Sequence, residues 1–213
     1  MDPSRLVDVV QGLVILILSL TVHEYAHAWA AFRLGDDTAA RLGRLSLNPM
    51  VHIDPIGSLL IPAVSAFSGI PAFGWAIPVP VNPLRFRRTV SMRAGMAWTA
   101  AAGPLSNFAI AIVGGIVVRV FAAAWPDALA FEGTRAFLRG MIATNVVLGI
   151  FNLLPIPPLD GSRLLPRSMD RFQQFAARWS FLLMMALIMT PIGTPIWLAS
   201  TIITVILAGP VLG

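Results

Sequence analysis

Long apolar stretches separated by short polar segments dominate this chain. Helix-length runs cover about residues 6–32, 94–123 and 137–151, and two more, 175–189 and 192–212, are divided by a TPIGTP turn. A helix of about 20 apolar residues is long enough to cross a bilayer. The pattern therefore predicts a bundle of membrane-spanning helices.

Two segments depart from this pattern. Residues 57–70 are apolar but form a run of only 14 residues between Pro55 and Pro71, so we expect a re-entrant or interfacial helix there. The next segment, residues 71–83, contains four prolines, which remove backbone donors and exclude a regular helix. It predicts an extended strand or hairpin.

Composition supports the membrane assignment. Hydrophobic residues make up 57% of the 213 residues and charged residues 12%, whereas soluble domains carry about 25% charged residues. We expect a single all-α, polytopic membrane domain over residues 1–213, with about five to six transmembrane helices, a re-entrant segment and a small membrane-associated β element. Its catalytic core should cover about residues 6–161, followed by two accessory helices at about 172–212.

The basic residues carry a topology signal. All fifteen are arginines, the net charge is +5, and the arginines stand singly or in short groups at the ends of apolar stretches. This distribution is typical of the positive-inside rule, so we expect no nucleic-acid partner. The first apolar run contains charged and histidine residues, which favours a retained span over a cleaved signal peptide. The absence of cysteine excludes disulfides and thiolate ligands.

The sequence HEYAH, residues 23–27, lies inside the first apolar run. Residues four apart share one face of a helix, so His23 and His27 can direct their imidazoles at one metal ion. Glu24 stands beside them, where it can accept a proton from an attacking water. A glutamate and two histidines inside a span are unfavourable unless they are paired or bind a metal. Histidines bonded to neighbouring helices, or a proton relay in a transporter, are the alternatives.

Two histidines leave a tetrahedral zinc site short of one protein ligand, with a fourth position open for water. The candidates are Asp160, His52, Asp54, Asp127 and Asp170. Asp160 is favoured because it ends the run NLLPIPPLDG, whose prolines break a span, and irregular backbone at membrane depth is tolerated where it lines a polar cavity. Capping of the next segment is its alternative role, and loop bracing is expected for His52 and Asp54.

Topology decides whether Asp160 can reach the histidines. If residues 57–70 do not cross the membrane, HEYAH and Asp160 emerge on the same side; if they cross, the two are separated. Without the crossing, that side also collects eleven of the fifteen arginines. With the crossing, the side richer in arginine would hold only nine. The eleven are Arg33, Arg41, Arg44, Arg85, Arg87, Arg88, Arg93, Arg163, Arg167, Arg171 and Arg178. The positive-inside rule then makes this side cytoplasmic.

Several separated motifs resemble the site-2 proteases, in particular their small prokaryotic branch without a PDZ or CBS domain. They are HEYAH (23–27), GRLSLNPMVHIDPIGSLLIP (43–62), FGWAIPVPVNP (73–83), AGPLSN (102–107) and NLLPIPPLDG (152–161). The resemblance covers most of the chain up to Gly161. In one departure, Ile77 stands where the family commonly has a lysine.

The resemblance implies one zinc ion held by His23, His27 and Asp160, with Glu24 as general base and acid. It also implies that Asn152 helps to hold the substrate strand or the oxyanion, and that residues 71–83 offer a β edge to the substrate. We therefore expect an intramembrane zinc metalloendopeptidase in the prokaryotic inner membrane. Its active site should open toward the cytoplasm, and its partners should be transmembrane protein substrates, the lipid bilayer and a regulatory membrane protein.

Two other functions remain open at this point. A zinc or proton transporter could use the same polar cluster, although it should continue the polar path to both sides of the membrane. A catalytically silent homologue could act as a membrane chaperone. Such a protein would usually lack Glu24 or a metal ligand, whereas all of these residues are present.

Overall fold

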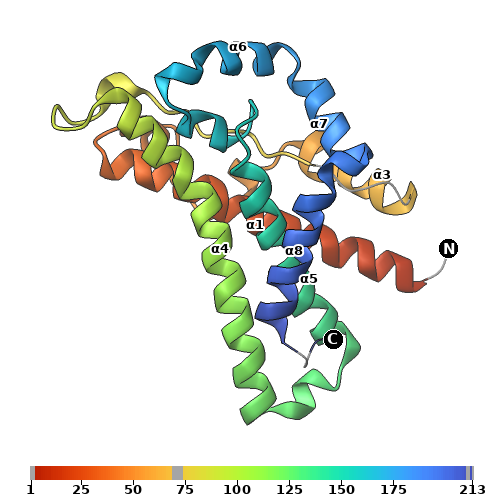
Figure 1. Cartoon of the computed structure of the whole chain (residues 1–213). Coiled ribbons are helices and arrows are strands. Elements are labelled where there is room, and N and C mark those ends of the chain that lie inside the picture. Colours follow the sequence, from red (N-terminus) through yellow and green to blue (C-terminus); the bar gives the residue numbers. More distant parts are fainter. Residues whose placement is uncertain (1–2, 69–73, 210–211, 213) are drawn as a thin grey trace.

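The computed structural model describes residues 3–68, 74–209 and 212, and its regular elements are helical (Figure 1). The α-helices are α1 (Pro3–Arg33), α2 (Thr38–Arg41), α3 (Ile61–Ser68), α4 (Met92–Ala124), α5 (Glu132–Asn152), α6 (Asp170–Arg178), α7 (Ser180–Met189) and α8 (Thr194–Ala208). A π-helical segment, Pro55–Leu60, runs directly into α3. No strand is assigned among the described residues, which fits the predicted all-α class.

Three helical segments are long and apolar enough to cross a membrane: Arg5–Arg33, Met92–Ala124 and Pro191–Ala208. Helices α6 and α7 would form a fourth if they count as one span, but they are bent by 76° at their junction. Helix α5 is more polar, since it contains Arg135, Arg139 and two asparagines. These helices fit an all-α membrane protein, and the predicted total of five to six spans stays a prediction.

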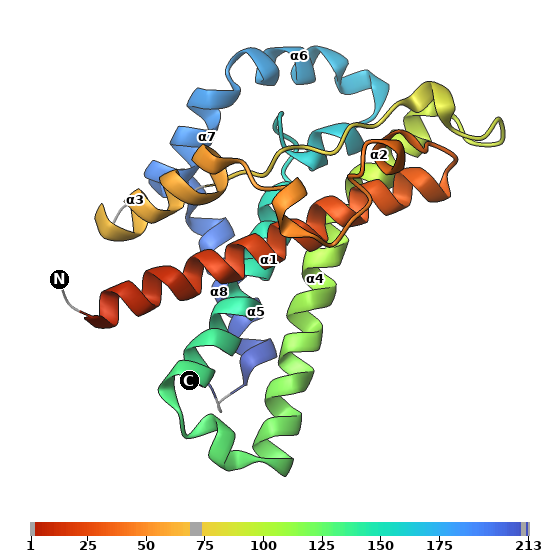
Figure 2. The same ribbon diagram turned by 180° about the vertical axis from the view of Figure 1, so that it is seen from behind.

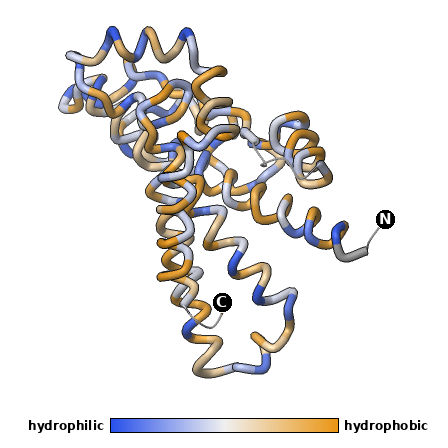
Figure 3. The backbone as a smooth tube through the Cα atoms, turned by 45° about the vertical axis from the view of Figure 1, so that its right-hand side comes forward, coloured by the Kyte–Doolittle hydropathy of each residue, from blue (hydrophilic) through white to orange (hydrophobic). Residues whose placement is uncertain are grey.

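The core of the bundle lies where α4, α5 and α8 pack together. Its buried side chains come from these helices and their ends: Ala111, Val118, Leu129, Ile142, Val146, Ala208 and Leu212. Large apolar side chains such as Trp98, Ile112 and Val205 are instead exposed on the outside. Figure 3 shows this apolar character continuing along the long helices, with polar residues gathered toward their ends. Such an outward-facing apolar surface is typical of a helix bundle in lipid.

Hydrogen bonds join the residues before α3 to the residues after it, so the segment that carries α3 starts and ends at the same place. Before α3, the carbonyl oxygens of Gly57 and His52 accept hydrogen bonds from the N–H groups of Trp75 (3.2 Å) and Ile77 (2.8 Å), which follow it. The Ser58 hydroxyl donates to the Trp75 carbonyl at 2.7 Å. Hydrogen bonds thus join the two ends of this segment, and its re-entrant role in the membrane stays a prediction.

The proline-rich segment after α3 is extended in its described part, from Gly74 to Asn82, and runs over α1 in both views (Figures 1 and 2). Residues 71–73 lie outside the described residues. The described part has no assigned strand, so the β element of residues 71–83 stays a prediction. Its position directly above α1 nevertheless brings it next to the HEYAH sequence.

A tight turn after α5 brings Asp160 back over the bundle. Helix α5 ends at Asn152, and a 3-10 turn begins at Asp160 and packs against α4. Gly161 makes this turn possible, because a Cβ at this position would lie 2.2 Å from the Leu153 carbonyl oxygen. A side chain there would push the turn apart and move Asp160.

Candidate metal centre

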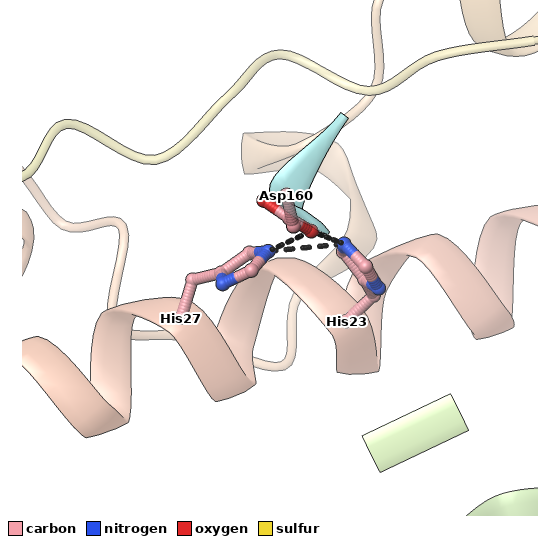
Figure 4. Close-up of side chains that lie close together, drawn as sticks. All are labelled: His23, His27 and Asp160. Atoms are coloured by element: carbon pink, nitrogen blue, oxygen red, sulfur yellow. Dashed lines mark hydrogen bonds and ion pairs between the residues drawn. The ribbon is translucent and has the colours of Figure 1, made fainter. Parts of the chain in front are cut away.

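Three side chains predicted from the sequence meet at one point (Figure 4). Helix α1 presents His23 and His27 on the same face, and the turn after α5 brings Asp160 above them. The two Nε2 atoms are 3.0 Å apart. Asp160 Oδ2 lies 3.2 Å from Nε2 of His23 and 3.1 Å from Nε2 of His27. The three donor atoms therefore form a nearly equilateral triangle.

Hydrogen bonds on the far side of each imidazole fix its tautomer. Nδ1 of His23 lies 2.6 Å from Asn107 Oδ1, and Nδ1 of His27 lies 2.7 Å from the Thr99 carbonyl oxygen. A carbonyl oxygen only accepts hydrogen bonds, so each Nδ1 carries the proton and donates it. In the neutral rings, each Nε2 is then left with a lone pair directed at the triangle.

The triangle fits a zinc ion. Two imidazole lone pairs and a carboxylate oxygen facing one another repel unless a cation or a proton lies among them. In a tetrahedral site with metal–ligand bonds of about 2.0–2.1 Å, neighbouring ligand atoms are about 3.3 Å apart, close to the observed 3.0–3.2 Å. Two histidines and one carboxylate are also a donor set of catalytic zinc sites. Within the described residues, no other group of three His, Asp or Glu side chains is close enough to hold a metal.

Glu24 lies beside the triangle and is held by the extended segment. Its side chain is buried, with a residue exposure of 9%, and its Oε2 accepts a hydrogen bond of 3.0 Å from the Val79 N–H. A cavity of about 490 Å³ opens onto Glu24, both histidines and Asp160. Side chains of α7, among them Met184, form part of its wall.

Asn152 lines the same cavity, and a residue of its own helix α5, rather than the triangle, accepts its hydrogen bond. Its Nδ2 donates to the Leu148 carbonyl oxygen one helical turn earlier, at 3.0 Å. The structure thus brings Asn152 to the site, and its role stays a prediction.

The other candidate ligands lie outside the triangle. His52 Nε2 bonds to the Ser46 carbonyl oxygen at 2.8 Å, and Asp54 caps the π-helical segment by accepting from the N–H groups of Ile56 and Gly57. These hydrogen bonds lower the pKa of the Asp54 carboxyl. Both residues brace their loop, as expected. Asp127 follows the far end of α4, and Asp170 lies 3.8 Å from Arg93.

Helix α4 supplies contacts that the sequence analysis left without a role. Thr99, Gly103 and Asn107 follow one another at intervals of four residues and meet the face of α1 that carries the histidines. A Cβ on Gly103 would lie 2.4 Å from His27 Nε2 and 2.6 Å from His23 Cε1. The sequence offered one signal for these contacts, which is a glycine and an asparagine four residues apart inside a predicted span. Small residues permit close helix packing, and polar residues inside a span mark functional contacts.

Comparison with known proteins gives consistent matches. Residues 88–190 match the sequence pattern of peptidase family M50. The chain is 38% identical over 188 residues to the putative zinc metalloprotease YwhC of Bacillus subtilis, covering 85% of this chain and 81% of that protein. It is 33% identical over 181 residues to the putative zinc metalloprotease Rip2 of Mycolicibacterium smegmatis, covering 82% and 65%. No solved structure matches the chain.

A third relative is the putative zinc metalloprotease Rip2 of Mycobacterium tuberculosis, which is 34% identical over 152 residues, covering 68% of this chain and 52% of that protein. The chain therefore spans most of the Bacillus protein and between half and two thirds of the two mycobacterial ones.

Gly103→Ala should strongly reduce metal binding, because the new methyl group would overlap both imidazoles. Zinc content of the purified protein in detergent measures the effect. Gly12→Ala on α1 is the matched control, since a Cβ there meets nothing within 4 Å. Full zinc occupancy in Gly103→Ala would contradict the observed packing of α4 against the histidines.

Proposed function

The chain belongs to peptidase family M50, the site-2 proteases, and on that premise we propose that it cleaves transmembrane segments of membrane proteins as an intramembrane zinc metalloendopeptidase. The observation that carries this proposal is the triangle of His23, His27 and Asp160 with Glu24 beside it. These groups line one cavity inside an apolar helix bundle. The site-specific roles below are part of the proposal.

His23, His27 and Asp160 would hold one zinc ion. Zinc, when bound, supplies a Lewis acid that makes water nucleophilic near neutral pH and polarises the scissile carbonyl. Glu24 accepts a proton from the attacking water and passes it to the amine nitrogen that leaves as the C–N bond breaks. Asn152, in the wall of the same cavity, would hold the substrate backbone or stabilise the negative oxygen.

The extended segment supports the substrate part of the proposal. The N–H groups of Trp75, Ile77 and Val79 are bound within the chain, and Pro78 and Pro80 have none. The carbonyl oxygens of Trp75, Ile77 and Pro78 already accept hydrogen bonds within the chain. A substrate strand alongside this segment would therefore bond mainly to the remaining carbonyl oxygens through its own N–H groups. Strand addition of this kind would satisfy the substrate backbone inside the membrane.

Contacts between loops support the prediction that the arginine-rich loops lie at one end of the helix bundle. The guanidinium groups of Arg41 and Arg85 pair with Asp37, which follows α1, and they hold the pKa of that carboxyl below its usual range. Arg93, at the start of α4, donates to the Leu165 carbonyl oxygen beyond α5. The loops that the non-crossing topology assigns to one side are thus in contact. The positive-inside rule would place this end, and the metal centre near it, toward the cytoplasm of a prokaryotic cell.

This proposal also includes a membrane protein partner that limits access to the cavity. The transporter and chaperone alternatives make a different prediction for Glu24, since neither requires it to activate water. The first experiment below separates them from the protease.

Glu24→Gln should abolish peptide cleavage while leaving zinc bound, because the amide cannot accept the proton of the attacking water. The expected loss is about 10²–10⁴-fold. Comparing membrane proteomes of cells with the wild type and the variant measures it, since uncleaved substrates accumulate. Glu132→Gln, in an exposed ion pair with Arg135, is the control. Unchanged cleavage in Glu24→Gln would refute the protease assignment.

Asp160→Asn should weaken zinc binding by more than the roughly 10–100-fold that loss of an outer partner causes, because it removes a charged ligand. Competition with a chelator of known affinity measures the change. Asp170→Asn serves as a control acid from the same side, outside the triangle. Wild-type zinc affinity in Asp160→Asn would show that another residue is the third ligand.

Val79→Pro should lower kcat by about tenfold, as expected for loss of one hydrogen bond to a charged group, because proline lacks the N–H that holds Glu24. Val79→Ala retains this N–H and should keep wild-type kcat. The assay uses a substrate identified by the proteome comparison, with zinc content measured in parallel. Equal kcat in the two variants would show that the Val79 hydrogen bond does not matter for catalysis.

A further inference from the structure

A buried chain of side-chain hydrogen bonds leads away from His23 into the bundle. We propose that Asn145 and Ser19 are positioning residues of the metal centre, which act on His23 through Asn107. Neither Asn145 nor Ser19 lies in a motif that carries the family resemblance. The inference rests on the proposed zinc site and adds two residues to it.

The contacts form a continuous path across three helices. From α4, Asn107 accepts the His23 Nδ1 proton through Oδ1 at 2.6 Å, and its Nδ2 donates to Oδ1 of Asn145 on α5 at 2.8 Å. Asn145 Nδ2 donates in turn to the Ser19 hydroxyl on α1 at 2.9 Å. The path begins and ends on α1, one helical turn apart.

Each member of the path has its hydrogen-bonding groups used. The second proton of Asn107 Nδ2 points to the Ser19 carbonyl oxygen at 3.5 Å, and that of Asn145 Nδ2 to the Met141 carbonyl oxygen at 2.9 Å. The Ser19 hydroxyl donates to the Ile15 carbonyl oxygen at 2.8 Å. Because every donor has an assigned acceptor, the Asn107 amide cannot turn over without breaking the path, and its oxygen stays directed at His23.

Burial makes this arrangement hard to replace. Ser19, Asn107 and Asn145 all have an exposed fraction of 0%. Water cannot readily take the place of a lost partner here, and an unsatisfied polar group in an apolar interior is costly. Loss of the Asn145 amide should therefore disturb Asn107 and, through it, the orientation of the His23 ring.

The two histidines differ in how they are held. His27 donates to a backbone carbonyl, that of Thr99, whereas His23 depends on a side-chain amide. A helix carbonyl is fixed by the backbone, but an amide side chain needs support to keep its orientation. This difference explains why a second layer of polar side chains lies behind His23. The path reaches His23 at Nδ1, which is the ring nitrogen that outer partners of metal-binding histidines contact.

The test measures zinc affinity of the full-length protein in detergent by chelator competition. Asn145→Leu should weaken zinc binding by about tenfold and Ser19→Ala by about threefold, at or below the range for outer partners of metal ligands. The double variant should lose no more affinity than Asn145→Leu alone, because Ser19 acts through Asn145. With cobalt in place of zinc, the visible absorption bands of Asn145→Leu should shift, since they report ligand geometry.

Thr21→Val is the matched control, since the Thr21 hydroxyl is also buried in α1 but bonds only to the Ile17 carbonyl oxygen of its own helix. It should keep wild-type zinc affinity and cobalt spectrum. If Asn145→Leu lowers thermal stability but leaves both unchanged, the path is only structural and the inference is wrong. Equal losses in Thr21→Val would overturn it as well. A wild type that binds no zinc would instead refute the proposed function.

Discussion

The close packing of α4 against α1 is the constraint on which the site depends. Each helix presents three residues spaced by four along one face. They are Ser19, His23 and His27 on α1, and Thr99, Gly103 and Asn107 on α4. Gly103 leaves no room for even a methyl group beside the imidazoles. Since the α4 backbone approaches so closely, its Thr99 carbonyl and Asn107 amide can accept both Nδ1 protons and leave both Nε2 atoms free for a metal.

The apolar surroundings require the polar groups at this contact to be compensated within the protein. In water, three facing acceptors could simply turn outward, whereas inside a helix bundle they must be compensated locally. The structure does so on two sides: a cation fits between the Nε2 atoms and Asp160, and hydrogen bonds occupy the opposite ring nitrogens. The amide path through Asn145 extends the second form of compensation to a third helix.

Two irregular segments complete the site around this rigid pair of helices. The turn after α5 supplies Asp160 and depends on Gly161 for its tightness, while the extended segment supplies the Val79 N–H to Glu24. Regular helices alone would leave no unpaired backbone to bind a peptide strand. A protease that acts on transmembrane segments needs such backbone inside the membrane, where it must line a cavity or be packed in protein.

The sequence by itself determined the membrane class, the long helices and the pairing of His23 with His27, because hydrophobic length and a spacing of four are local properties. It also favoured Asp160, but only on the condition that residues 57–70 do not cross the membrane. Tertiary structure brought Asp160 to the histidines, and it joined the two ends of the segment around α3 through the Gly57–Trp75 and His52–Ile77 hydrogen bonds. It also decided the contacts of Gly103, Asn145 and Val79, because no local pattern encodes a contact between residues so far apart in the chain.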